Sequence, residues 1–176
     1  CSLAPPPPAR FDPPHSDYGF DTDNDNLYNY LIVEVDVEVD NAGWYRVGGS
    51  LLDSGWNFIT YAWTENYLET GTQTLELRFN GWQINSSGRD GPYRVYMDLF
   101  DGGWNWLDVD LHWTAFYTHD QFQPPPARFD PPHSDYGLDT DNDNLYEYLV
   151  VEVNLEVNIA GGYRISSNLY DNAYHW

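Results

Sequence analysis

Alternating apolar and polar residues run through much of the chain and predict β-strands. The clearest alternation covers residues 31–39, where valines at 33, 35, 37 and 39 alternate with acidic residues at 34, 36 and 38. A period of two residues is typical of a strand with one buried and one solvated face. We therefore expect the valines of this segment to lie in the core and its carboxylates to face water.

The same pattern predicts further strands downstream, separated by turn residues. These strands are expected at 44–52, 57–64, 72–80, 92–100, 105–113 and, as a short last strand, through Phe116 and Tyr117. In the 105–113 segment, the apolar phase that should face the core holds Leu107, Val109, Leu111 and Trp113. About seven strands in roughly 100 residues, without a convincing helix, predict an all-β fold, an antiparallel immunoglobulin-like sandwich.

A sequence repeat divides the chain. Residues 6–19 recur letter for letter at 124–137, an offset of 118 residues, and 21–39 align closely with 139–157. The second copy stops at Trp176, which corresponds to Phe58 of the first copy. We therefore expect one complete unit followed by the first half of another.

Proline-rich segments open both copies. The expected boundaries are a Pro-rich N-terminal segment at 1–19, a complete sandwich at 20–119, a Pro-rich junction at 120–137 and an incomplete unit at 138–176. Pro5–Pro8 and Pro124–Pro126 predict extended polyproline II. The residues that follow these prolines recur unchanged, which a flexible tether would not require. We therefore expect each segment to pack at a domain junction.

Carboxylates at alternate positions precede the first strand. Asp21, Asp23 and Asp25 repel one another unless a cation neutralises them, and Ca²⁺ takes six to eight oxygen ligands. Their spacing matches positions 1, 3 and 5 of an EF-hand-type loop. Leu27 then offers a backbone carbonyl at position 7, and Asn29 stands at position 9.

The second repeat carries the same pattern, at Asp139, Asp141, Asp143, Leu145 and Glu147. Ile32, at position 12, cannot be a bidentate ligand, so the missing ligands must come from elsewhere. Asp17, with its copy Asp135, and Asp12 are the candidates. A solvated acidic turn is the alternative, because Asp and Asn form turns readily. We expect a structural calcium ion in each loop and no catalysis.

A family resemblance accompanies this loop. The blocks DYGFDTDNDNLYNYLIVEVDVEV, GWYRVGGSLLD, LETGTQTLELRFNGWQI and GRDGPYRVYMDLFD resemble a β-sandwich repeat module of large secreted or cell-surface proteins of archaea and bacteria. The resemblance covers the first unit and the available half of the second. It implies an accessory or structural role, a calcium loop at the aspartates named above, and no catalytic residues. Asn26 stands where such loops usually carry Gly, although Asn tolerates the left-handed conformation better than most residues.

Composition narrows the classes of function. The chain has 28 acidic and 7 basic residues, all of the latter Arg, for a net charge of −21. This balance argues against nucleic acid and against anionic lipid, both of which are bound through Lys and Arg. The chain has no apolar stretch of about 18 residues, so we expect no transmembrane helix. We expect an extracellular or cell-surface protein, with Cys1 a candidate for lipidation or simply the start of a fragment.

Several Trp residues fall at turns or on the outward phase of the predicted strands, namely Trp44, Trp82, Trp104 and Trp106. Such residues are candidates for stacking on sugar rings or for packing against another subunit. Gly162 replaces Trp44 in the second copy, which favours subunit packing over a sugar platform shared by all units. Asn85 opens a glycosylation sequon, which is meaningful in a secreted protein.

These patterns together predict a non-catalytic extracellular structural protein. Its tandem calcium-stabilised sandwiches would form a filament or cell-surface stalk, with other copies or tandem neighbours as partners. The alternative is a carbohydrate-binding or accessory module of a larger secreted protein.

Overall fold

The computed structural model describes residues 6–171. The chain forms two compact units, Cys1–Pro125 and Pro126–Trp176. The expectations placed on Cys1, Pro5 and Trp176 fall outside the described residues. Among those that are described, no helix is long and apolar enough to cross a membrane.

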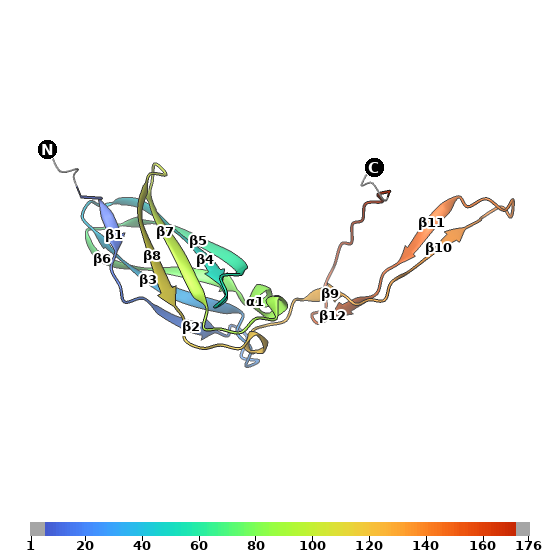
Figure 1. Cartoon of the computed structure of the whole chain (residues 1–176), viewed down its shortest axis with the longest axis horizontal. Coiled ribbons are helices and arrows are strands. Elements are labelled where there is room, and N and C mark those ends of the chain that lie inside the picture. Colours follow the sequence, from blue (N-terminus) through green and yellow to red (C-terminus); the bar gives the residue numbers. More distant parts are fainter. Residues whose placement is uncertain (1–5, 172–176) are drawn as a thin grey trace. The chain divides into compact units, whose positions relative to one another are not determined.

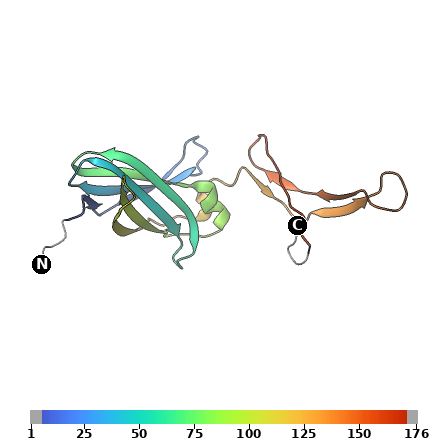
Figure 2. The same ribbon diagram turned by 90° about the horizontal axis from the view of Figure 1, so that it is seen from above.

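The first unit is a sandwich of two antiparallel sheets (Figures 1 and 2). One sheet contains β1 (Ala9–Phe11), β2 (Ser16–Phe20), β3 (Tyr30–Val39) and β6 (Gly71–Asn80). The other has the order β5 (Phe58–Leu68), β4 (Gly43–Leu52), β7 (Arg94–Asp101) and β8 (Trp106–Trp113). This arrangement confirms the all-β sandwich that the alternating pattern predicts.

The core lies between the two sheets and is built from the inward phase of each strand. Val33, Val35 and Val37 of β3 have no exposed surface, as the alternation predicts. Across the core they meet residues of the second sheet such as Val47 and Leu99, which are equally buried. Each fully buried side chain of this size contributes roughly 1.5–3 kcal/mol, so the two faces hold the sheets together.

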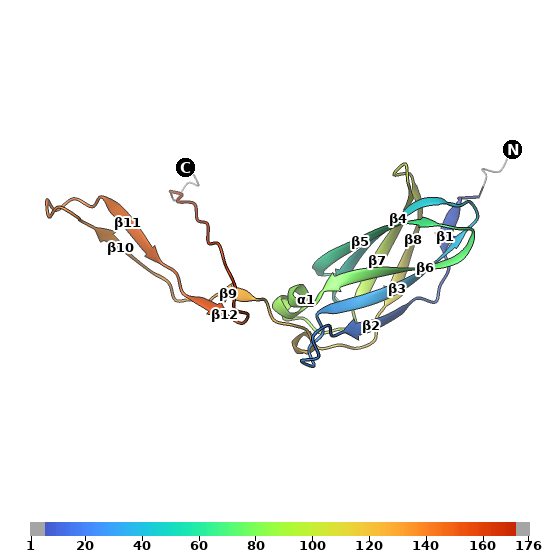
Figure 3. The ribbon, with the colours of Figure 1, turned by 180° about the vertical axis from the view of Figure 1, so that it is seen from behind.

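The Pro-rich N-terminal segment belongs to the sandwich. β6 pairs with the whole of one edge of β3, while β1 and β2 share the opposite edge (Figure 3). Ala9 and Phe11 of β1 are buried in the same core as the valines of β3. β1 and β2 therefore belong to the sandwich, which was expected to begin at residue 20. The segment packs against its own unit, which explains why its side chains recur.

β8 is the strand whose predicted phase is wrong. Residues directly opposite one another in an antiparallel pair share a face. Asp110 lies opposite Met97, and His112 lies opposite Val95, so these polar side chains of β8 point to the core side. Trp113, expected in the core, is 46% exposed.

Inward polar residues are tolerated here because β8 is an edge strand covered by the N-terminal segment. The backbone N–H of Phe11 donates to Asp108 of β8, at 2.9 Å. His15 reaches Asp110 in the same way, with its Nε2 at 3.2 Å from the carboxylate. Polar pairing between the two segments thus closes this side of the sandwich, where the pattern predicts an apolar contact.

Two short helical segments were not expected from the sequence: α1 (Gly81–Ser87) and a 3₁₀ turn at His119–Gln121. Gly81 is required at the start of α1, because a Cβ there would lie 2.3 Å from the carbonyl oxygen of Tyr28. Asn80 precedes the helix without a side-chain cap, so the usual sequence signal of a helix start is missing. The short strand expected at Phe116 and Tyr117 is irregular backbone.

The second unit repeats the beginning of the first. β9 (Ala127–Phe129) pairs with β12 (Leu155–Val157), and β10 (Ser134–Leu138) pairs with β11 (Tyr148–Glu152). The registers are those of the first unit, since Ala127 lies opposite Val157 as Ala9 lies opposite Val39. In the described part of this unit, Val151 is 56% exposed, whereas Val33, its counterpart, is fully buried.

Candidate functional sites: two acidic loops and an aromatic sheet face

The first acidic loop, residues 21–27, connects β2 to β3 and brings its aspartates together. Asp21, Asp23 and Asp25 each offer a carboxylate oxygen within 4.8 Å of the others. The Asp21 carboxylate accepts hydrogen bonds from the backbone N–H groups of Asn24, at 2.7 Å, and Asn26, at 2.9 Å. Both asparagines have positive φ, 62° and 72°, and Asn adopts this region more readily than most residues. The loop therefore wraps around Asp21.

The charge of this loop is uncompensated within the described structure. Desolvation acts to raise the pKa of Asp21, but backbone N–H donors outweigh it and hold that pKa below its usual value. None of the ion pairs among the described residues includes an aspartate of the loop. Three neighbouring carboxylates without a cationic side chain suit a hard divalent cation, so the donor set fits Ca²⁺.

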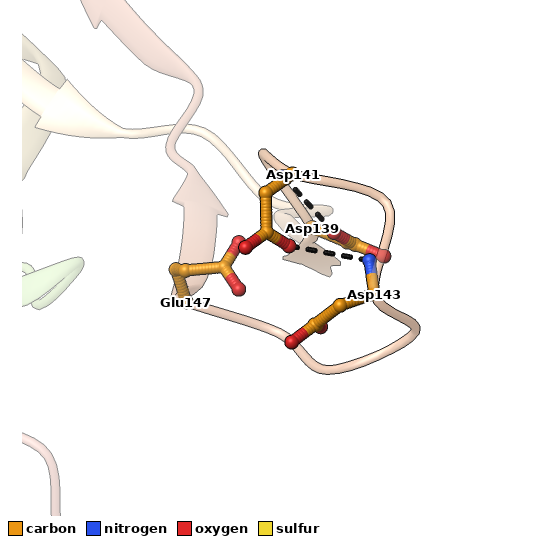
Figure 4. Close-up of side chains that lie close together, drawn as sticks. All are labelled: Asp139, Asp141, Asp143 and Glu147. Carbon is orange, nitrogen blue, oxygen red and sulfur yellow. Dashed lines mark hydrogen bonds between the residues drawn. The ribbon is translucent and has the colours of Figure 1, made fainter.

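The second acidic loop, residues 139–147, has the same construction and a fourth carboxylate. Figure 4 shows Asp139, Asp141, Asp143 and Glu147 turned toward one another. Glu147 accepts hydrogen bonds from the backbone N–H and the hydroxyl of Thr140, which lower its pKa. This loop therefore offers four carboxylate ligands where the first offers three.

The other positions of the predicted ligand set help to close the loops. Asn29 accepts the hydrogen bonds of Thr22 in the first loop, as Glu147 accepts those of Thr140 in the second. The backbone N–H groups of Leu27 and Leu145 donate to Asp25 and Asp143, at 2.9 and 2.8 Å. All of these residues lie at the loops, as their spacing predicts.

Asp17, expected as a further ligand, is placed elsewhere. Its carboxylate accepts hydrogen bonds from Tyr117 Oη and His112 Nε2, both at 2.8 Å, and from the backbone N–H of Ala115. The side chain is 6% exposed. Asp17 thus joins the polar contacts that close the sandwich at β8. Its copy Asp135 is exposed and lies outside the second carboxylate cluster. Asp12 accepts a hydrogen bond from Thr72.

The acidic loop of the first unit holds the segment through which the chain leaves that unit. Gln123 Nε2 donates to Asp25, at 2.6 Å, and the Gln123 backbone N–H donates to the carbonyl of Tyr28, at 3.0 Å. Phe122, fully buried, packs against the rings of Tyr28 and Tyr117, which also contact each other. The exit segment, residues 119–123, is therefore fastened to the loop by side chains and backbone.

Asn85 stabilises the same exit segment from α1. Its Nδ2 donates to the carbonyl oxygens of Phe122, at 3.0 Å, and His119, at 3.3 Å. Glycosylation would consume this nitrogen and place a glycan where the exit segment packs. The structure therefore disfavours Asn85 as a glycosylation site in the folded unit.

The outward Trp residues gather on one sheet, with one exception. The outer face of the β5-β4-β7-β8 sheet, here called the aromatic face, exposes Trp44, Tyr61, Trp63, Tyr67, Tyr96, Trp104, Trp106 and Trp113. Trp82 is 41% exposed on α1, away from this sheet. The sequence pattern missed the β5 members, although small inward residues at Thr60 and Ala62 alternate with large aromatic ones.

A groove of about 340 Å³ runs across this face. Its walls are Tyr61, Trp63, Phe100 and Trp104, and Gly48 and Arg46 lie at its floor. The Arg46 guanidinium stacks 3.7 Å from the centre of the Trp104 ring and pairs with Glu65 at 2.6 Å. The sequence alone does not indicate this groove, because its walls and floor come from β4, β5, β7 and the turn after β7.

Comparisons with known proteins give limited similarity. No family model matches the chain, and no curated protein matches it. A calcium-binding mutant of Bacteroides uniformis β-glucuronidase 2 aligns with 70% of this chain and 15% of its own, with 14% identity and a TM-score of 0.44. A glycosyl hydrolase family 2 member from Bacteroides cellulosilyticus aligns over 60% of this chain and 15% of the enzyme, with 10% identity and a TM-score of 0.43. The chain thus spans about 15% of the length of these enzymes.

Proposed function

We propose that this chain is a non-catalytic structural part of an extracellular protein. Its tandem β-sandwich repeats, each stabilised by calcium at its acidic loop, are the links of a cell-surface stalk or filament. The single observation that carries the proposal is the contact between the first acidic loop and the exit segment, made by Asp25 and Gln123.

Calcium at the loop would act directly on this contact. Without a cation, the carboxylates of Asp21, Asp23 and Asp25 repel one another and favour opening of the loop. A bound Ca²⁺ would offset that repulsion and hold Asp25 in place. Since Asp25 also accepts the hydrogen bond of Gln123, the ion would secure the point at which one repeat gives way to the next. A filament under load requires stability at this point.

The hydrogen bonds of the histidines support the non-catalytic assignment. His112 is bonded to Asp17, and His119 is bonded to Asp90, each at 2.8 Å. His15 is buried against β8. These pairs tie segments together, and none lies in the groove of the aromatic face.

Electron microscopy of the full chain, with calcium and then with excess chelator, tests this proposal. We expect regular linear assemblies in calcium that fray in chelator. The variant Asp23→Ala should fray even in calcium, whereas Glu69→Ala, an exposed acidic residue outside the loops, should behave as the wild type. Small dispersed particles under both conditions would refute the structural role.

A further inference from the structure

The aromatic face carries large rings in regular rows. Gly48 of β4 lies between Trp63 of β5 and Asp98 of β7 in one row. Ser50 lies between Tyr61 and Tyr96 in the next. Trp63 and Trp104 are 63% and 65% exposed, which leaves much of two indole rings in water. Apolar surface that gathers in this way on one sheet marks a binding site.

Gly48 creates the groove between these rings. A Cβ at this position would lie 2.1 Å from the hydroxyl oxygen of Tyr61, so the Tyr61 ring lies directly across the glycine. Trp104 covers Arg46 on the other side. A volume of about 340 Å³ lies at the lower end of the range of ligand sites, which is roughly 300–1,000 Å³.

Two arginines of the aromatic face, Arg46 in the groove and Arg94 outside it, are only partly satisfied. Arg46 pairs with Glu65, yet its buried Nη1 has no hydrogen-bond partner among the described residues. Arg94 lies against the rings of Trp56 and Trp113, and its buried Nε and Nη1 also have no hydrogen-bond partner among the described residues. A buried donor without an acceptor costs free energy.

We propose that this face binds a neutral polysaccharide. The C–H faces of pyranose rings would stack on Trp63 and Trp104, and sugar hydroxyls would pair with the partly exposed carboxylates of Glu65 and Asp98 beside these rings. Aromatic walls with a few oriented polar groups are the usual construction of a small-ligand site. A polyanionic chain is disfavoured, because the net charge of −21 repels it.

A second copy of this chain fits the face less well than a sugar. The centres of protein–protein interfaces are depleted in Lys, Glu and Asp, although Arg is enriched there. Here the carboxylates of Glu65 and Asp98 lie among the rings, and an apolar protein partner would desolvate them without offering partners. Sugar hydroxyls both donate and accept, so they satisfy groups of either sign.

The site belongs to the first unit. Arg46 is retained as Arg164 in the second repeat, but Gly48 is replaced by Ser166, and Trp44 by Gly162. The floor of the groove is therefore not repeated unchanged in the second copy. The inference is independent of calcium binding and of filament formation.

Affinity electrophoresis of the full chain in gels containing hydroxyethyl cellulose, xylan or galactomannan tests the proposal, with polygalacturonate as the charged comparison. Titration of tryptophan fluorescence with oligosaccharides of the retarding polymer then gives the affinity. We expect at least one neutral polymer to retard the protein, and Trp63→Ala and Trp104→Ala each to weaken binding about tenfold or more. Trp82→Ala, an exposed Trp outside this face, is the matched control and should bind as the wild type.

Three outcomes would overturn the inference. The first is the absence of retardation by any of the neutral polymers, and the second is retardation by polygalacturonate alone. The third is a concentration-dependent dimer in sedimentation that Trp63→Ala abolishes, which would assign the face to a second copy. Thermal unfolding of each variant shows whether the fold is intact. Because these variants lie outside the acidic loops, filaments seen in microscopy should persist in them.

Discussion

At the scale of single residues, the three aspartates of the first acidic loop differ in what they do. Asp21 accepts several backbone N–H groups and so holds the shape of the loop. Asp25 holds the exit segment through Gln123. Asp23 adds charge to the cluster without such a contact to the exit segment, which makes it the residue to change when calcium binding is tested apart from loop structure.

Asp23→Ala should lower the melting temperature in calcium and leave it nearly unchanged in excess chelator. The reason is that an ion bound only by the folded state stabilises it, by roughly 1.4 kcal/mol at tenfold excess over the dissociation constant. Scanning calorimetry of the wild type and the variant under both conditions measures this difference. Glu69→Ala is the control, and equal losses in calcium and in chelator would refute the assignment of the ion.

The loops could be predicted from the sequence because their chemistry is local. Asp21, Asp23 and Asp25 lie within five residues, so their spacing already brings the carboxylates together. The role of Asp17 could not be predicted in this way. Its partners, His112 and Tyr117, are 95 and 100 residues away, and only the pairing of strands brings them into contact.

At the scale of elements, the N-terminal segment covers the edge strand β8 through hydrogen bonds between polar groups. His15 is the most buried of these groups, with a side chain that is 2% exposed. Its Nδ1 accepts a hydrogen bond from the backbone N–H of Asp36, so Nε2 carries the proton toward Asp110. Burial lowers the pKa of His15, and this effect outweighs the opposing charge of Asp110.

This burial gives the contact a dependence on pH. Since the pKa of His15 is lower in the folded state than in the unfolded state, the unfolded chain takes up more protons as the pH falls below about 6.5. The free energy of unfolding should therefore fall from pH 7.5 through the lowered pKa and then level off. His15→Gln should remove this dependence, as measured by denaturant unfolding in excess chelator. If the free energy of unfolding of the variant still changes with pH as in the wild type, the effect belongs to other groups.

The elements themselves were largely predictable, whereas the faces of some were not. The strands expected at 31–39 and 72–80 differ from β3 and β6 by one residue at their starts. Leu107 packs against the core as expected, but Val109, Leu111 and Trp113 face out while the polar residues between them face the N-terminal segment, so the phase predicted for most of β8 was wrong. Periodicity locates a strand, but which of its faces is buried depends on what covers it.

At the scale of the whole molecule, negative charge dominates the chain. The net charge is −21, and each acidic loop gathers at least three carboxylates in a small volume. Such charge keeps a protein soluble, but its self-repulsion destabilises the compact state. Two bound calcium ions would neutralise four of these charges, leaving −21 + 4 = −17.

Monovalent salt should therefore stabilise the calcium-free chain. At 0.01 M ionic strength the screening length is about 30 Å, and at 1 M it is about 3 Å. We expect the melting temperature in chelator to rise with sodium chloride concentration, and the rise to be smaller when calcium is present. Equal salt dependence with and without calcium would show that the ion does not reduce the repulsion.

The membership of β1 and β2 in the first sandwich bears on how such a chain can change during evolution. The repeated sequence begins in the prolines just before β1, and so does each structural unit. Recombination between the two proline runs would therefore insert or delete an entire sandwich without cutting a sheet. If the chain forms a stalk as proposed, the number of its links could then vary between related genes.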